Sequence, residues 1–269
     1  MADEFSSPAP CVTRRYPGRL IINLTNECAM FCRHCQRKRN IGGVDRKKSL
    51  REISAALDYV RDNREIRDVL LTGGDALALS DAELHWILSE LDDVRHVEIK
   101  RLGTRMLCTL PMRVTKELAC MLGRHRPLYV NTHFNHPKTV TLEAALACDR
   151  LSRAGIPLGN QAVLLKGIND DANVMKKLCQ ELLKISVRPY CLFHCKNVPG
   201  AGKFRTSVQK GMEIVRQMRG FTSGLAIPAF VVNAPGGWGK VPLLPNNLVG
   251  RKKGRLLLKT WEGRVIEYS

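Results

Sequence analysis

Short apolar segments alternate with longer amphipathic segments along most of this chain, and this alternation constrains the fold more than any other feature. The apolar runs that we expect to form strands are 20–25, 69–72, 97–102, 128–132, 158–164, 188–193 and 226–232. The amphipathic stretches that we expect to form helices are 49–63, 80–93, 115–124, 141–154, 171–185 and 207–219. Strands that alternate with helices are typical of repeated βα units. The pattern therefore predicts an α/β fold with a parallel sheet, helices outside it, and full or partial closure into a barrel.

The same segments predict how the chain is divided. Residues 255–259 and 264–268 flank Glu262 and Gly263 and are expected to form a β-hairpin extension at the C-terminal end. One hydrophobic core can serve about 250 residues. We therefore expect a single core domain over residues 15–269, preceded by a disordered leader over residues 1–14. In such a domain the active site lies at the carboxyl ends of the strands.

The charge of the chain narrows the possible ligands. It carries 43 Lys and Arg against 25 Asp and Glu, a formal net charge of +18. This excess attracts polyanions, so nucleic-acid binding is an alternative, although an anionic substrate or cofactor fits equally well. No stretch approaches the ~20 apolar residues of a membrane span, and the first residues do not resemble a signal peptide. The 10 cysteines are therefore expected to be mostly reduced thiols in a cytoplasmic protein without membrane contact.

Three cysteines follow the first expected strand with the spacing C-x3-C-x2-C, namely Cys28, Cys32 and Cys35. Three thiolates can hold a [4Fe–4S] cluster and leave one iron open to another ligand. Structural zinc with His34 as the fourth ligand is the alternative, but His34 adjoins Cys35 and no distant C-x2-C pair completes a tetrahedral set. The segment resembles the radical S-adenosylmethionine (SAM) superfamily. That resemblance implies that the open iron binds the amino acid part of SAM.

A second segment, LTGGD after the second expected strand, resembles the Gly-Gly-Glu segment of the same superfamily. The resemblance implies that Gly73, Gly74 and Asp75 contact the amino group of SAM. By itself, a Gly-Gly pair after a strand indicates only a turn. The superfamily resemblance also implies a partial (β/α)6-type radical SAM barrel and an external electron donor such as flavodoxin or ferredoxin.

Residues 234–241 form a glycine-rich segment near the C-terminal end that contains Lys240. The segment is not a P-loop, because Val241 stands where a Ser or Thr would follow the lysine. A glycine-rich turn can still offer backbone amides to a phosphate, and a neighbouring lysine can form an imine with an aldehyde. Pyridoxal phosphate (PLP) carries both groups. Taken alone, the segment favours an ordinary solvent-facing lysine after a flexible turn.

The order and spacing of several motifs resemble the 2,3-aminomutases, a family of radical SAM enzymes that also use PLP. These motifs include CAMFCRHCQRKR, LLTGGDAL, NTHFNHP and FVVNAPGGWGK, and the resemblance covers about residues 15–269. It implies that Lys240 is the Schiff-base lysine and that Arg37 holds the substrate α-carboxylate through its planar fork. The other residues that the resemblance implies near the cofactors are Arg15, Tyr16, Arg19, His133, His136, Gly236 and Gly237. Core or capping roles are the alternative for the two histidines.

Two positions of the family pattern concern the distal end of the substrate. Where lysine aminomutases are expected to carry two aspartates, this chain has Lys196 and Asn233. A buried lysine facing a substrate ammonium would leave two like charges desolvated together. A distal carboxylate could instead pair with Lys196 and accept a hydrogen bond from Asn233, a pattern that resembles glutamate 2,3-aminomutases. The implied reaction is an isomerisation of L-glutamate to β-glutamate.

Several alternatives remain beside this reading. The substrate could be aspartate or lysine, or the chemistry could be that of a related radical SAM and PLP desaturase or dehydratase. A basic RNA-binding protein with a vestigial cluster is the non-enzymatic alternative. Asp171 stands where the lysine enzymes place a cysteine of an intersubunit zinc site, so we expect no zinc, and a homo-oligomer stays possible.

Overall fold

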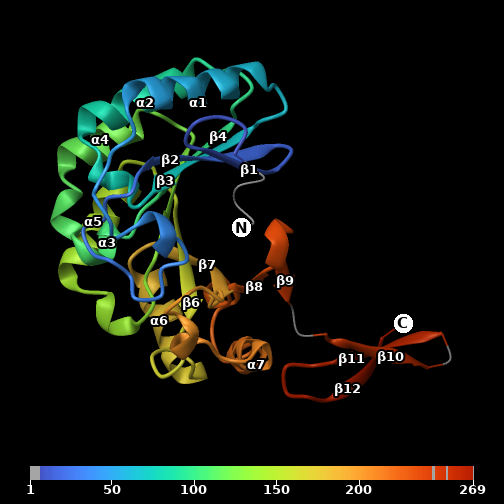
Figure 1. Cartoon of the computed structure of the whole chain (residues 1–269). Helices are drawn as coiled ribbons and strands as arrows, with labels where there is room; N and C mark the ends of the chain where they lie inside the picture. The colour runs from blue at the N-terminus through green and yellow to red at the C-terminus, as the bar shows by residue number, and fades with distance from the viewer. Residues whose placement is uncertain (1–6, 244–245, 253, 269) are drawn as a thin grey trace.

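The structure, a computed structural model, describes residues 7–243, 246–252 and 254–268. Its main sheet contains nine strands that lie in chain order, and they form an arc that is open on one side (Figure 1). The strands are β1 (Val12–Tyr16), β2 (Arg19–Thr25), β3 (Asp68–Gly73), β4 (Ile99–Gly103), β5 (Leu128–Thr132), β6 (Leu158–Leu164), β7 (Val187–His194), β8 (Ala229–Asn233) and β9 (Lys240–Leu243). Strands β2 to β8 are parallel, while β1 and β9 pair antiparallel at the two ends of the arc.

Helices occupy every crossover between the parallel strands and cover the outer face of the arc (Figure 1). They are α1 (Leu50–Asp62), α2 (Asp81–Asp92), α3 (Met106–Thr109), α4 (Lys116–Gly123), α5 (Leu142–Arg153), α6 (Ala172–Lys184) and α7 (Val208–Met218). Short 3-10 turns add η2 (Lys38–Asn40), η3 (Ala76–Ala78), η4 (Pro111–Arg113), η5 (Pro137–Thr139), η6 (Gly202–Phe204), η7 (Gly224–Ala226) and η8 (Pro235–Gly237). The six strand-to-helix repeats confirm the predicted partial (β/α)6 barrel.

The helices begin where the sequence signals them. Ser49 and Ser80 accept hydrogen bonds from the backbone of Glu52 and Glu83, and both glutamates bond back to the serine backbone. These complete capping boxes satisfy amide groups that a helix would otherwise leave unpaired. The two helices therefore start at the residues that the spacing predicts.

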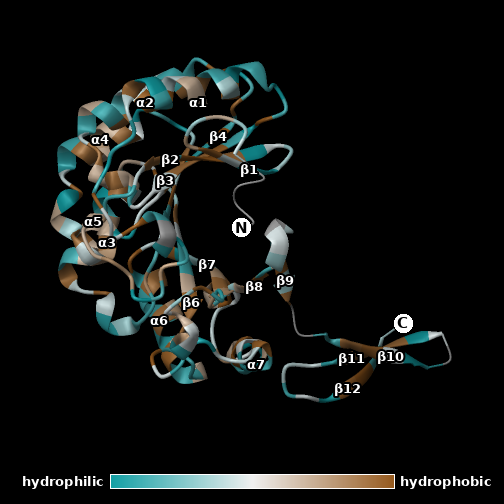
Figure 2. Ribbon diagram, in the orientation of Figure 1, coloured by the Kyte–Doolittle hydropathy of each residue, from teal (hydrophilic) through white to brown (hydrophobic). Residues whose placement is uncertain are grey.

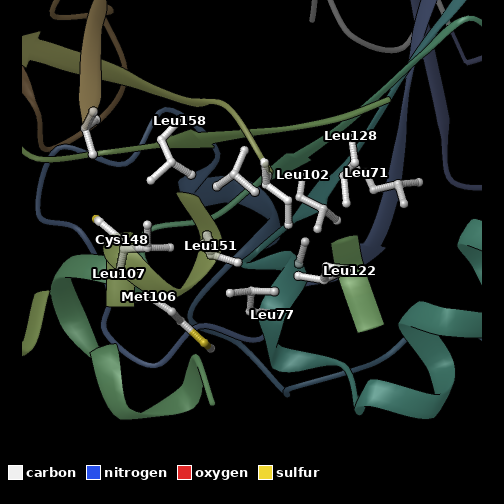
Figure 3. Packing of buried hydrophobic residues seen from close by; sticks show 14 of the residues in the cluster. Leu71, Leu77, Leu102, Met106, Leu107, Leu122, Leu128, Cys148, Leu151 and Leu158 are labelled. Atoms are coloured by element: carbon white, nitrogen blue, oxygen red, sulfur yellow. The ribbon is translucent and has the colours of Figure 1, made fainter. Parts of the chain in front are cut away.

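The core lies between the sheet and the helices. Leu71, Leu102, Leu128 and Leu158 come from four successive parallel strands, and all are nearly or fully buried. Figure 3 shows them packed against apolar side chains of the outer layer, among them Leu122 of α4. Hydrophobic residues follow the strands in Figure 2, whereas the helices carry both hydrophilic and hydrophobic residues. Burial of one such leucine side chain contributes roughly 2 kcal/mol, so the contact between sheet and helices stabilises the barrel.

Some expectations change in the structure. Residues 12–14 of the predicted disordered leader instead lie in β1, which pairs with β2, and residues 1–6 lie outside the described residues. The last barrel strand starts at Ala229, since Ala226 belongs to η7. The predicted hairpin is part of a separate three-stranded sheet, β10 (Leu248–Lys252), β11 (Arg255–Lys259) and β12 (Val265–Tyr268), which projects from the barrel (Figure 1). Among the described residues, no helix is long and apolar enough to cross a membrane.

Candidate active site

The three cysteines lie together in the loop that follows β2, and each is half-buried. Burial raises the pKa of the Cys28 thiol to about 12, and the nearby Asp75, Cys32 and Cys35 raise it further. The Cys35 N–H donates to the Cys32 carbonyl oxygen at 3.0 Å, which closes a turn between these two cysteines. The loop therefore presents a compact set of three thiols at the carboxyl end of β2.

Hydrogen-bond donors already face two of these sulfur atoms. The Arg105 guanidinium donates to Cys32 Sγ at 2.9 Å, and the Arg37 backbone N–H donates to Cys35 Sγ at 3.3 Å. Among the described residues, no three His, Cys, Asp or Glu side chains converge on one metal ion. In a cubane cluster each cysteine binds a different iron, so its ligands need not converge in that way. The three cysteines are therefore compatible with a cluster held by three thiolates.

Gly73 and Gly74 fix the end of β3 against the cysteine loop. Gly73 has a φ of +143°, and a Cβ atom there would lie 2.2 Å from the Thr25 backbone oxygen. A Cβ atom on Gly74 would lie 2.1 Å from the Glu27 backbone oxygen, and Gly74 N–H donates to Thr25 O at 2.6 Å. Side chains would separate the two segments. The glycine pair is therefore required for close backbone packing beside the three thiols.

Asp75 is buried, and its carboxylate is engaged by the protein itself. Its Oδ1 atom accepts hydrogen bonds from Leu77 N–H at 3.0 Å and from the Thr104 hydroxyl at 2.6 Å. Its Oδ2 atom accepts a hydrogen bond from Arg105 N–H at 2.7 Å. Burial raises the pKa of Asp75, while these donors act against the rise. The carboxylate fixes the backbone of the arginine that faces Cys32.

His133 directly follows β5 at the carboxyl end of this strand. Its Nδ1 atom is 2.8 Å from the Gln161 carbonyl oxygen, so Nδ1 carries the proton and Nε2 is left as an acceptor. Burial lowers the pKa of His133 to about 4, and the positive charges of Arg105, Lys240 and Arg37 lower it further. His133 is therefore a neutral imidazole whose surroundings include Arg105, Arg37 and Lys240. By contrast, His136 accepts a hydrogen bond from Lys138 N–H and caps η5, so it has the capping role left open above.

Arg37 reaches into the mouth of the barrel. Its guanidinium donates to Asn23 Oδ1 of β2 and, at 3.3 Å, to the Gly73 carbonyl oxygen. It also lines a cavity of about 310 Å³, whose other lining residues are Asn23, Thr25, Asn26, Asn40, Ile41, Arg46, Lys48, Gly73 and Gly74. A guanidinium held in this way can receive a carboxylate without a change of backbone.

Lys240 begins β9 at the opposite end of the arc. Its backbone N–H donates to the Tyr16 hydroxyl at 2.8 Å, and this bond joins the two edge strands of the sheet. Gly239 has a φ of +89°, and a Cβ atom there would lie 2.6 Å from the same hydroxyl. Asn233 is paired directly with Lys240 in the β8–β9 ladder. The glycine-rich turn thus brings both residues beside the end of β1.

Positive charges surround the Lys240 ammonium group. The residue is accessible to solvent, and its Nζ atom lies 4.8 Å from the centre of the Phe193 ring. Burial of the ammonium group by surrounding protein lowers the pKa of Lys240; Cys191 acts against this, and Arg101, Arg19 and Arg15 lower the pKa further. A lowered pKa favours the neutral amine that reacts with an aldehyde. The same three arginines supply the charge that a phosphate requires, so the residues present fit PLP.

The remaining predicted residues lie around this group. The Arg19 guanidinium stacks on the Tyr16 ring at 3.8 Å, and Gly236 has a φ of +67° in the turn of η8, which also contains Gly237. Lys196 follows β7 and Asn233 ends β8, and these two strands are parallel neighbours. The structure therefore brings the predicted residues of β1, β7, β8 and β9 to one end of the barrel.

The sequence did not predict two residues of this site, Arg101 and Arg105. Arg101 points from β4 and donates to Asp68 at 2.7 Å, and Arg105 follows the same strand. Nothing in a motif marked them. Their only signal was a position in or directly after a parallel strand, which is where barrel enzymes place site residues.

Two family models match parts of this chain. Residues 22–178 match the radical SAM superfamily, and residues 215–269 match the family described as lysine-2,3-aminomutase. Among solved structures, Streptococcus suis SuiB bound to S-adenosylmethionine superposes with a TM-score of 0.60 at 12% identity, covering 82% of this chain and 51% of that one. At that identity the similarity shows the fold alone.

Two curated relatives are much more similar in sequence. The glutamate 2,3-aminomutase of Clostridioides difficile is 58% identical over 267 residues, covering 99% of this chain and 63% of the relative. A putative L-lysine 2,3-aminomutase of Aquifex aeolicus is 48% identical over 261 residues, covering 97% of this chain and 70% of the relative. The chain thus spans less than two thirds of the length of the Clostridioides protein.

Proposed function

The chain belongs to the lysine 2,3-aminomutase family of the radical SAM superfamily, and we propose that it is an isomerase that converts L-glutamate to β-glutamate. The observation that carries the proposal is the pair Lys196 and Asn233: Lys196 follows β7, and Asn233 ends the neighbouring strand β8 and pairs with Lys240 in the β8–β9 ladder. The Clostridioides relative, named for glutamate, supports the same substrate.

The proposal requires three bound groups. Cys28, Cys32 and Cys35 would hold a [4Fe–4S] cluster whose open iron binds SAM, and Lys240 would hold PLP with its phosphate near Arg15 and Arg19. When bound, these groups supply an adenosyl radical that removes a hydrogen atom and a conjugated ring that delocalises an unpaired electron.

The protein itself orients the substrate and controls charge. The Arg37 guanidinium is already held by hydrogen bonds to Asn23 and to the Gly73 carbonyl oxygen. It would therefore offer a fixed group to the substrate α-carboxylate. His133 stays neutral and can accept a hydrogen bond at Nε2 without adding charge. Side chains that are already positioned for the reaction do not have to rearrange while it proceeds. This lowers the energy barrier of the reaction.

The distal end of the substrate decides between glutamate and lysine. Lys196 adds a positive charge and Asn233 adds none, so a substrate ammonium would face a like charge. Such a juxtaposition costs several kcal/mol, whereas a distal carboxylate gains an ion pair with Lys196 and an amide hydrogen bond from Asn233. The pair therefore favours an acidic amino acid over lysine.

An exchange of charge at this pair tests the proposal. We expect Lys196→Asp combined with Asn233→Asp to lower glutamate turnover by roughly 100-fold or more and to raise the ratio of lysine to glutamate turnover. Lys116→Asp, a charge change on the exposed start of α4, is the matched control. A wild-type protein that converts lysine in preference to glutamate would contradict the proposed substrate.

A further inference from the structure

The large positive charge is not explained by the substrate site, and part of it gathers around the cysteine loop. Residues 27–48 contain seven Lys or Arg and two acidic residues. Some of these cations are already paired, because Arg46 and Lys48 bond to Glu52, and Lys47 bonds to Glu83. Arg37 points into the barrel mouth. This leaves the cations nearest to the thiols to be explained.

Two of those cations, Arg33 and Lys38, face a loop from the other side of the barrel. The Phe204 ring in the loop after β7 has Arg33 at 5.5 Å and the Lys203 ammonium at 5.4 Å from its centre. A Cβ atom on Gly200 in the same loop would lie 3.0 Å from the Lys38 ammonium. The contacts join both loops into one surface directly beside Cys32 and Cys35.

The charges of this surface are not compensated within the described part of the chain. No ion pair between described residues involves Arg33, Lys38, Lys203 or the exposed Arg205 that follows Phe204. The Phe204 ring orients the side chains of Arg33 and Lys203. This orientation reduces the conformational entropy that these side chains lose when an anionic partner binds. The surface is therefore prepared for a partner with an acidic face.

Exposed apolar side chains lie next to these charges. Met30 is 56% exposed and Phe31 is 52% exposed, and both lie between Cys28 and Cys32 in the sequence. Aromatic residues, Met and Arg are enriched in protein interfaces relative to the rest of the protein surface. We define the electron-transfer surface as Met30, Phe31, Arg33, Lys38, Lys203 and Arg205.

We propose that the electron-transfer surface docks an acidic protein that carries single electrons on a flavin or an iron–sulfur centre. The inference rests on the proposed function, because the cluster must gain one electron before it can cleave SAM. The carrier is oxidised by one electron and the cluster is reduced by one, and no atom is transferred. Electron-transfer complexes bury small areas and depend on charge for encounter, so a few oriented cations beside two apolar side chains are sufficient.

The test compares two reductants on the reconstituted protein under anaerobic conditions. The double variant Lys203→Glu with Arg205→Glu reverses charge without touching the cysteine loop, and Lys116→Glu on α4 is the matched control. Cluster reduction is followed by absorbance and electron paramagnetic resonance, with reduced flavodoxin as the carrier and dithionite as the small reductant. At low salt we expect the double variant to be reduced by flavodoxin about tenfold more slowly than wild type, with dithionite reduction unchanged.

Each other outcome has a definite meaning. Equal slowing in Lys116→Glu, or a wild-type rate that does not fall with added salt, would overturn the docking surface. Loss of self-association in the double variant without slower flavodoxin reduction would assign the surface to a second copy of the chain. A protein that takes up no iron would overturn the proposed function, and the inference would fail with it.

Discussion

Two regions of the barrel mouth are built in different ways. The thiol half comprises the cysteine loop and the ends of β3 and β4, where Gly73, Gly74 and Asp75 are tied to their neighbours by backbone bonds. The lysine half comprises β1, β8 and β9, where the Tyr16 hydroxyl links the two edge strands and Lys240 is accessible to solvent. The thiol half is thus held by backbone bonds, while the edge strands of the lysine half are linked through the Tyr16 side chain. A substitution in the thiol half is therefore expected to disturb the structure more than one in the lysine half.

The largest expected effect comes from breaking the thiol half. In Gly74→Ala the new methyl group would overlap the Glu27 carbonyl oxygen, so the cysteine loop must move. We expect a loss of about 3 kcal/mol in the free energy of unfolding, as for overpacked interiors, and little iron uptake on reconstitution. Gly43→Ala in the same loop is the control, since among the described residues other than its two chain neighbours no heavy atom lies within 4 Å of its Cβ position. Normal iron uptake by Gly74→Ala would show that the glycine is not needed.

A smaller effect is expected on the midpoint potential of the cluster. Arg105 donates to Cys32 Sγ, and loss of this cation disfavours the more negative, reduced cluster. We expect the midpoint potential of Arg105→Gln to fall by about 60 mV, which corresponds to about 1.4 kcal/mol for one electron. A redox titration followed by electron paramagnetic resonance measures it, and Arg105→Lys should keep most of the potential. An unchanged midpoint potential in Arg105→Gln would show that the Arg105 charge does not act on the cluster.

The sequence predicted most of the architecture. It did not predict the elements whose structure depends on contacts between segments that are far apart in the chain. Helix starts at Ser49 and Ser80 followed from local capping, and the parallel strands followed from apolar runs. Strand β1 was missed because it is polar and depends on pairing with β2, and β9 was missed because its Pro242 is tolerated only at an edge. The roles of Arg101 and Arg105 depend on which side chains the register turns inward, and no local pattern encodes that.

The lysine half should respond to the loss of one hydroxyl group. Tyr16→Phe removes the acceptor of the Lys240 backbone N–H, a hydrogen bond worth about 1 kcal/mol. We expect faster hydrogen exchange at the Lys240 amide and weaker PLP binding, with the overall fold unchanged. Tyr190→Phe on β7 is the matched control, because this tyrosine is 48% exposed. Equal exchange in both variants would indicate that the link between β1 and β9 is not held by Tyr16.

The smallest effect is a dependence of stability on pH. The pKa of His133 is lowered from 6.5 to about 4, so the unfolded chain binds the proton more readily than the folded protein. The stabilisation is complete above pH 6.5 and is lost as the pH falls toward 4. Between pH 7 and pH 5 we expect His133→Gln to remove on the order of 1 kcal/mol of the acid destabilisation. Urea unfolding at the two pH values measures it, and parallel pH curves for both proteins would contradict the neutral imidazole.

The central claim is that both halves act together on glutamate. Its most direct measurement is the product formed when the protein, reconstituted anaerobically with iron, sulfide and PLP, receives SAM, dithionite and L-glutamate. Chromatography with mass detection should show β-glutamate with the mass of the substrate. A product lighter by two hydrogens, conversion of lysine in place of glutamate, or 5′-deoxyadenosine without any amino acid product would contradict the claim.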